Sequence, residues 1–129
     1  MLKLAPGVVL FEKRPRWEAV LKRALSVDRL QIRPCRSAAD LTAVCRTMQG
    51  SVAVIDYEVG PALVLEWLQQ SQLEGLTVSP AIILPLEAGP LEWPLRELGA
   101  QAVLRSPIRN QELVALCRSL LPVAPKGVA

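Results

Sequence analysis

The stretch Ser51-Val52-Ala53-Val54-Ile55-Asp56 decides the fold of this chain. Its apolar residues follow one another without the polar alternation of a half-exposed strand, so they predict a β-strand that is covered on both faces. A strand of this kind belongs to a parallel sheet with helices packed on either side. Asp56 closes the run, which places its carboxylate at the carboxyl end of a central strand.

On both sides of this strand, short apolar runs alternate with amphipathic stretches along the chain. Pro15 predicts the start of the first helix, while Ser37 and Asn110 are typical N-caps of later helices. Pro94 interrupts the fourth helical stretch, which we therefore expect to be short or irregular. The second strand alternates with polar residues, which favours an edge position. The predicted strands are 7–11, 30–35, 51–56, 80–84 and 102–104, and the predicted helices are 15–26, 37–50, 61–72, one within 89–99, and 110–121.

Strand–helix units joined by short connections imply a mostly parallel sheet, because each right-handed crossover must pack back on the sheet. The expected fold is a doubly wound α/β domain spanning residues 1–122, with 123–129 as a flexible tail. The length of 129 residues matches about one domain. In such folds, functional groups gather where the strands end. None of these loops carries a glycine-rich nucleotide-binding motif, which argues against nucleotide cofactors.

Composition narrows the classes of function further. The chain has no histidine, so ordinary hydrolase triads and histidine metal sites are excluded. Its three cysteines match no metal or disulfide spacing and are interpreted as small buried side chains. No apolar run approaches the roughly 20 residues of a membrane span. Residues 1–7 lack the pattern of a secretory signal, so we expect a cytoplasmic protein.

The positive charge of the chain is mild. Its formal net charge is +3 and its pI is about 9.0, which could favour an acidic partner. Arg29, Arg33 and Arg36 form a basic set near the second strand, but no aromatic residues are interleaved with them, so nucleic acid is disfavoured as a partner. Lys13, Arg14 and Arg16 are interpreted as a solvated basic face rather than an anion site.

The order of these units, with an acid after the third strand and prolines after the first and fifth, resembles the receiver domain of bacterial response regulators. The resemblance spans roughly residues 6–122 and implies a flavodoxin-like fold with strand order 2-1-3-4-5. It places Asp56 at the phosphoacceptor position. Glu12 takes the place of the first acid of the metal-binding pocket, and Lys13 takes the place of the second, which reverses a charge.

The switch positions of the family also differ in this chain. Pro85 stands where the resemblance implies a hydroxyl residue, and Val103 stands where it implies an aromatic one. Ser106 replaces the lysine of the family, and the resemblance implies a cis bond between Ser106 and Pro107. Without the hydroxyl and the aromatic residue, the usual two states that phosphorylation discriminates cannot be built.

Metal binding is expected to be weak or absent, because Mg²⁺ is held by carboxylates and a lysine beside them repels it. Glu12 and Asp56 are the only weak candidates for ligands, and no cofactor is expected. We also consider that Lys13 pairs with Asp56 or Glu12 as a substitute for the cation. Asp56 itself is either a phosphoacceptor or a strand-end carboxylate held by backbone N–H groups, and the second interpretation is favoured.

Two tryptophans receive different interpretations. Trp67 lies in an apolar helical stripe and is predicted to be part of the core, whereas Trp93 is a candidate exposed anchor for a partner. The family often associates through its fourth helix, fifth strand and fifth helix. In this chain that face would carry Trp93, Leu95, Arg105 and Arg109.

The function favoured by the sequence is a degenerate receiver that acts in signal transduction as a protein-interaction module, without enzymatic activity and independent of phosphorylation. Its partner would be a histidine kinase, an output domain, another regulator or a second copy of the chain. The alternative is a conventional phosphoacceptor receiver of a phosphorelay that uses Asp56 and Mg²⁺. A third hypothesis, an enzyme or small-ligand binder that uses the same strand-end crevice, has little support from the residues.

Overall fold

The computed structural model describes residues 4–122. Five strands alternate with five α-helices, and short 3₁₀ helices follow α1, β3 and β4. The elements are β1 (Val8–Phe11), α1 (Glu18–Leu25), β2 (Ile32–Cys35), α2 (Ala38–Thr47), β3 (Ser51–Asp56), α3 (Pro61–Glu74), β4 (Val78–Leu84), α4 (Glu92–Glu97), β5 (Ala102–Arg105) and α5 (Asn110–Leu120), with the 3₁₀ helices at Ser26–Asp28, Tyr57–Val59 and Leu86–Leu91.

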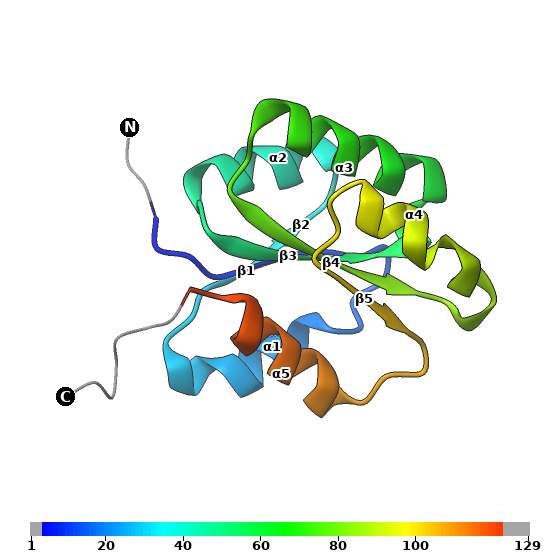
Figure 1. The fold of residues 1–129 in the computed structure, drawn as a ribbon. Helices are drawn as coiled ribbons and strands as arrows, with labels where there is room; N and C mark the ends of the chain where they lie inside the picture. The colour runs from blue at the N-terminus through cyan, green and yellow to red at the C-terminus, as the bar shows by residue number, and fades with distance from the viewer. Residues whose placement is uncertain (1–3, 123–129) are drawn as a thin grey trace.

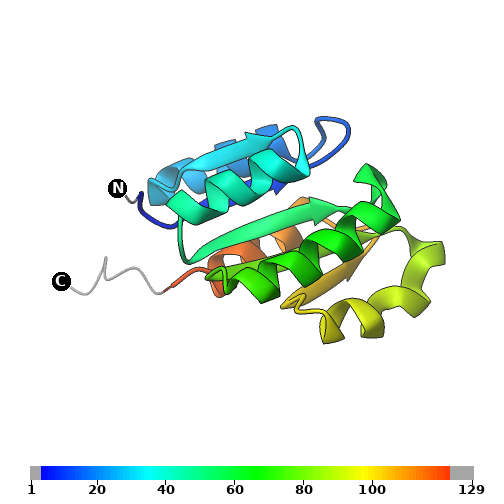
Figure 2. The ribbon, with the colours of Figure 1, turned by 90° about the horizontal axis from the view of Figure 1, so that it is seen from above.

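The strands form one parallel sheet in the order β2-β1-β3-β4-β5, which confirms the predicted fold class and strand order. Helices α2, α3 and α4 cover one face, while α1 and α5 cover the other (Figure 1). Figure 2, seen from above, shows α2 and α3 running roughly along the strands that they cover. Each layer of helices buries its own apolar cluster against the sheet.

The central strands are buried on both faces, as the unbroken apolar runs predict. Every residue of β1 and β3 is buried. β2 lies at one edge of the sheet, as its polar alternation predicted, and only two of its four residues are buried. Because β1 and β3 are neighbours in register, with Phe11 beside Ile55, the residues that follow both strands emerge at the same edge.

Several helix boundaries differ from those predicted. Helix α1 begins at Glu18 rather than at Pro15. The residues between them form a bent turn whose backbone N–H groups donate to a side chain outside the helix. Helix α5 begins at Asn110, so Asn110 is not its N-cap. That position belongs to Arg109, whose backbone N–H donates to Glu112 Oε1 at 2.8 Å. The predicted cap at Ser37 is confirmed, because its hydroxyl accepts from the N–H of Asp40 at 3.0 Å.

Helix α4 is short, as Pro94 predicted, and the 3₁₀ helix at Leu86–Leu91 leads into it. Trp67 is buried and donates through Nε1 to Thr42 Oγ1 at 2.9 Å, which confirms its place in the core. The cysteines are free and buried, also as expected. Within residues 4–122, no helix is both long and apolar enough to cross a membrane. The predicted tail at 123–129 lies outside the described residues.

Candidate functional site

The loops after β1, β3, β4 and β5 surround a crevice at the carboxyl edge of the sheet. Its cavity has a volume of about 560 Å³. Charged side chains come from the loops after β1 and β3, and the loops after β4 and β5 supply mostly uncharged ones. The residues that line it are Arg14, Arg16, Asp56, Tyr57, Glu58, Ile83, Pro85, Leu86, Glu87, Ser106 and Pro107.

Asp56 lies at the base of this crevice and is only 8% exposed. Its Oδ1 atom accepts a hydrogen bond from the backbone N–H of Glu58 at 2.9 Å, which caps the 3₁₀ turn that follows β3. Gly60 ends this turn with φ of +136°, a conformation that favours glycine, and the chain can then enter α3 at Pro61. The local structure therefore already uses one oxygen of the Asp56 carboxylate.

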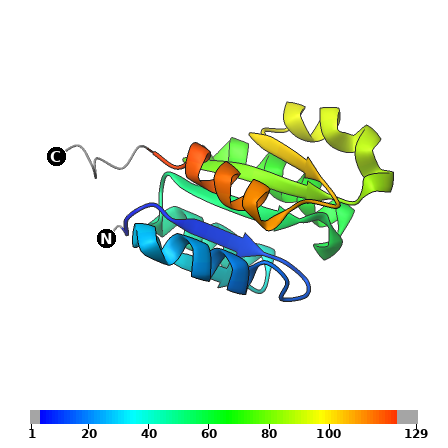
Figure 3. The same ribbon diagram turned by 90° about the horizontal axis from the view of Figure 1, so that it is seen from below.

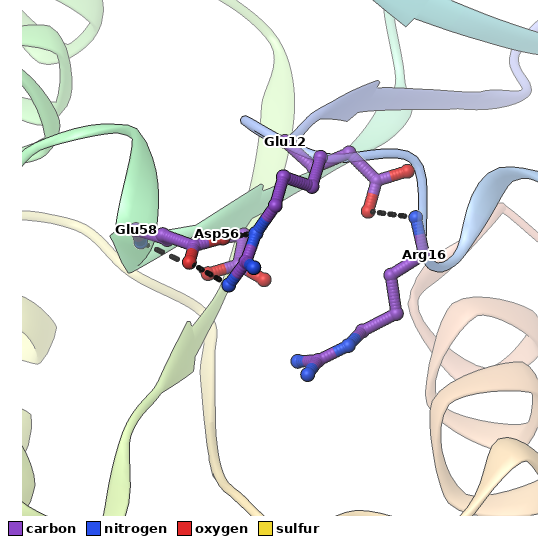
Figure 4. Close-up of polar contacts among 5 residues, drawn as sticks. Glu12, Arg16, Asp56 and Glu58 are labelled. Atoms are coloured by element: carbon purple, nitrogen blue, oxygen red, sulfur yellow. Dashed lines mark hydrogen bonds and ion pairs between the residues drawn. The ribbon is translucent and has the colours of Figure 1, made fainter.

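Glu12 is turned toward helix α1. Its carboxylate accepts hydrogen bonds from the backbone N–H groups of Arg16, Trp17 and Glu18, at 3.1 to 3.3 Å. Arg16 and Trp17 directly precede α1 and Glu18 is its first residue, so no residue within the helix can accept from these N–H groups. A carboxylate at this end also interacts favourably with the helix dipole. Glu12 thus acts as a remote cap of α1 (Figure 4).

Arg14, and not Lys13, forms the ion pair at this edge of the sheet. Arg14 donates from Nη2 and Nε to the two carboxylate oxygens of Glu58, in a paired arrangement. The hydrogen bond from Arg14 lowers the pKa of Glu58, and Glu58 together with the charge of Asp56 raises the pKa of Arg14. Lys13 is exposed and forms no ion pair within residues 4–122, so the hypothesis that it pairs with Asp56 or Glu12 is wrong.

Sequence reasoning did not identify the pair of Arg14 and Glu58. The signal that could have revealed it is the adjacency of β1 and β3, because residues shortly after two neighbouring parallel strands lie close together. Arg16 lines the same crevice, and its guanidinium group points away from Glu12 (Figure 4). It also lies over the ring of Trp17, 5.9 Å from the centroid. The basic residues after β1 are therefore partly committed to contacts within the protein rather than forming only a solvated face.

The other wall of the crevice carries the positions that differ from the resemblance. Pro85 and Ser106 both line the cavity, whereas Val103 is buried in the core. The backbone N–H of Ser106 donates to the carbonyl of Leu84 at 2.8 Å, which joins the ends of β4 and β5. The peptide bond between Ser106 and Pro107 is cis, which confirms the expectation from the resemblance.

Comparison with known proteins supports the fold. The signal receiver domain of a putative LuxO repressor protein from Vibrio parahaemolyticus is 18% identical, with a TM-score of 0.77 and coverage of 91% of this chain and 90% of that one. A response regulator from Thermotoga maritima is 17% identical, with a TM-score of 0.74 and coverage of 91% and 98%. An adenylate cyclase from Rhodopirellula baltica is 16% identical, with a TM-score of 0.74 and coverage of 91% and 87%.

The chain has the receiver-domain fold. At this level of identity the likeness concerns the fold alone. No protein-family model matches the sequence, and no curated protein matches it either. The receiver fold nevertheless fixes which residues to compare, because it places Asp56 at the end of β3 and Glu12 after β1 at the same edge of the sheet.

The receiver fold implies a divalent cation, and the donors present do not fit one. Glu12 faces the N–H groups of α1, and the guanidinium of Arg14 lies within electrostatic reach of Asp56. No group of three or more acidic or cysteine side chains within residues 4–122 is arranged to hold a metal ion. Mg²⁺ is held by carboxylates together with waters and phosphate oxygens, so this donor set is a poor match for it.

The structure exposes some of the residues expected to form the interaction face and buries one of them. Trp93 is 69% exposed on α4, as predicted. Leu95, however, has no exposed surface and packs in the core between α4 and the sheet, so it cannot contribute to a face. Arg105 pairs with Glu92 of α4 at 3.1 Å, which ties β5 to α4 next to Trp93. Arg109 is exposed.

Proposed function

We propose that this protein is a degenerate receiver that acts in signal transduction as a protein-interaction module, independent of phosphorylation. The observation that carries the proposal is the position of Glu12. Its carboxylate holds the first turn of α1. To bind a cation, Glu12 would have to give up its hydrogen bonds to three backbone N–H groups, which has a cost in stability.

The charges around Asp56 support the same proposal. Arg14 pairs with Glu58 and adds a positive charge to the electrostatic surroundings of Asp56. A guanidinium repels a metal cation, and it has no lone pair with which to coordinate one. Asp56 in turn keeps a structural role, because it caps the turn after β3. A carboxylate held in this way needs no phosphoryl group to order its loop.

The residues around the crevice also lack a means of transmitting phosphorylation. Pro85 has no hydroxyl group to move toward a phosphoryl group, and Val103 is a small side chain that is buried in the core. The ion pair between Arg105 and Glu92 connects β5 to α4 in the ground state. An allosteric response requires two states between which a ligand discriminates. The module is therefore proposed to bind its partner in one constant conformation.

Trp93 is the anchor that we propose for this partner. A tryptophan that is 69% exposed on a short helix offers a large apolar surface at low entropic cost, and tryptophan is enriched among residues that dominate interfaces. Arg109 adds an exposed positive charge at the start of α5. By analogy with the receiver fold, the partner would be a histidine kinase, an output domain, another regulator or a second copy of this chain.

Titration with Mg²⁺ tests the proposal against the conventional alternative. The backbone amide resonances of Arg14, Asp56 and Glu58 are followed by NMR as MgCl₂ is added at constant ionic strength. The proposal predicts no saturable shift of these amides, and the same behaviour in the Asp56→Asn variant. A saturable shift that Asp56→Asn abolishes would instead support a conventional phosphoacceptor receiver.

A further inference from the structure

A groove separates helices α1 and α5 on the face of the sheet opposite to α4. The two helices lie side by side over the sheet in Figures 1 and 3. The cavity between them has a volume of about 380 Å³. The side chains that define it are Val20, Arg23 and Ala24 of α1, and Val114, Ala115 and Arg118 of α5.

The floor of the groove is apolar and lined by short side chains. Val114 is buried, Val20 and Ala24 are half-buried, and Ala115 is exposed at the wall. The separation between two packed helices depends on the size of the side chains at their contact, so alanine and valine allow a third helix to approach closely. An apolar groove between two helices is the usual seat of an amphipathic helix from a partner.

The rim of the groove is positively charged. Arg23 and Arg118 line it, and no aspartate or glutamate is among the lining residues. Arg118 is held in place, because its guanidinium pairs with Asp28 at 2.9 Å and donates to the carbonyl of Ala24 at 3.2 Å. Arg23 has no ion pair within residues 4–122. The guanidinium of Arg23 is therefore available to a carboxylate on a partner.

We propose that this groove binds an acidic amphipathic helix of a partner protein. The apolar side of the helix would lie on Val20 and Val114, and its carboxylates would meet Arg23 and the free donors of Arg118. Complementary charge at the rim sets the orientation and the rate of encounter, while the apolar floor supplies most of the affinity. The net charge of +3 adds a weak long-range attraction for an acidic partner. This surface is separate from the crevice of Asp56 and from Trp93.

A synthetic helical peptide tests the proposal directly. The probe carries leucine and alanine along one face and glutamate along the other, and a matched probe has lysine in place of glutamate. Binding to the full chain is measured by fluorescence anisotropy, and the site is mapped by NMR shifts. We expect saturable binding of the acidic probe alone, with shifts confined to α1 and α5, and a weaker affinity at high salt.

Two variants place the binding in the groove. Arg23→Glu is expected to weaken binding of the acidic probe by about tenfold. Ala115→Glu is expected to abolish binding, because the larger side chain would project from the wall and occupy the groove. Arg36→Glu is the control, since it makes the same change of charge in the exposed β2–α2 loop. Circular dichroism verifies that each variant is folded.

Three results would overturn the proposal. The first is equal binding of the acidic and basic probes, and the second is an equal loss of affinity in Arg23→Glu and Arg36→Glu. The third is a dimer in sedimentation analysis that Ala115→Glu disrupts, because a second copy of the chain would then occupy the groove. None of these results depends on the state of Asp56, so the proposal fails or holds separately from the proposed function.

Discussion

Replacing Glu12 with alanine distinguishes a structural carboxylate from a member of an acidic metal pocket by the sign of its effect on stability. In a cluster of carboxylates that repel one another, neutralising one of them stabilises the fold, because like charges disfavour ionisation. In this structure, Glu12 instead accepts from the N–H groups of Arg16, Trp17 and Glu18. Its removal leaves the first turn of α1 without its acceptor, so we expect Glu12→Ala to destabilise the protein.

The magnitude follows from the contacts. Loss of a helix N-cap costs about 1–2 kcal/mol, and a hydrogen bond to a charged group contributes about 1.5–3 kcal/mol. Water replaces part of the loss, because these N–H groups are exposed or only part-buried. We therefore expect a decrease in the free energy of unfolding of about 2 kcal/mol, which lowers the urea midpoint by about 1 M.

The assay is equilibrium unfolding in urea, followed by circular dichroism. Glu66→Ala serves as the control, since Glu66 is an exposed carboxylate on α3 and its loss should change stability by less than about 0.5 kcal/mol. If Glu12→Ala were as stable as the wild type, or more stable, the assignment of Glu12 as the cap of α1 would be refuted.

Three further predictions concern other parts of the molecule. Leu95→Ala should lower the free energy of unfolding by about 3 kcal/mol, because it opens a cavity in the core. Trp93→Ala should change the free energy of unfolding by less than about 1 kcal/mol, because its side chain is exposed. If urea unfolding ranked the two variants in the reverse order, the placement of both side chains would be contradicted. Burial raises the pKa of each of the three cysteine thiols to about 12, so a thiol reagent at mildly alkaline pH should label the denatured protein but not the native one; fast labelling of the native protein would exclude this burial. Ion pairing lowers the pKa of Glu58 in the folded state, so its contribution to stability is present above its unfolded pKa of about 4.3 and is lost as the pH falls through the lower folded value. In Glu58→Gln, the free energy of unfolding should therefore fall less steeply below about pH 4.5 than in the wild type. The same pH dependence of urea unfolding in both proteins would count against the pair with Arg14.

The architecture could be predicted from the sequence because the strands are buried on both faces. The run from Val52 to Ile55 has no polar residue, which is typical only of a central strand in a helix-covered sheet. The alternation around Ile32 and Arg33 likewise indicated an edge strand. The predicted start of α1 was wrong. Pro15 is a good first helical residue, but the helix begins at Glu18, where the carboxylate of Glu12 accepts from the backbone N–H.

The site was less accessible to sequence reasoning, because its contacts join residues far apart in the chain. Glu12 and Asp56 lie at the edge of the sheet where the sequence placed them. What each carboxylate binds depends on the bent turn after β1, which has no regular pattern in the sequence. For the same reason, the sequence suggested that Lys13 pairs with Asp56 or Glu12, whereas the observed ion pair joins Arg14 to Glu58. Leu95 was misplaced because the resemblance assigned the fourth helix to an interaction face, whereas this side chain packs in the core.

The most direct test of a phosphorylation-independent module is the intact mass of the protein after incubation with Mg²⁺ and acetyl phosphate. Asp56→Asn is the matched control, and a conventional receiver in a parallel reaction verifies that the conditions are effective. Our account predicts an unchanged mass for both the wild type and the variant. A phosphoryl adduct on the wild type that Asp56→Asn removes would contradict it, and would assign Asp56 as a working phosphoacceptor.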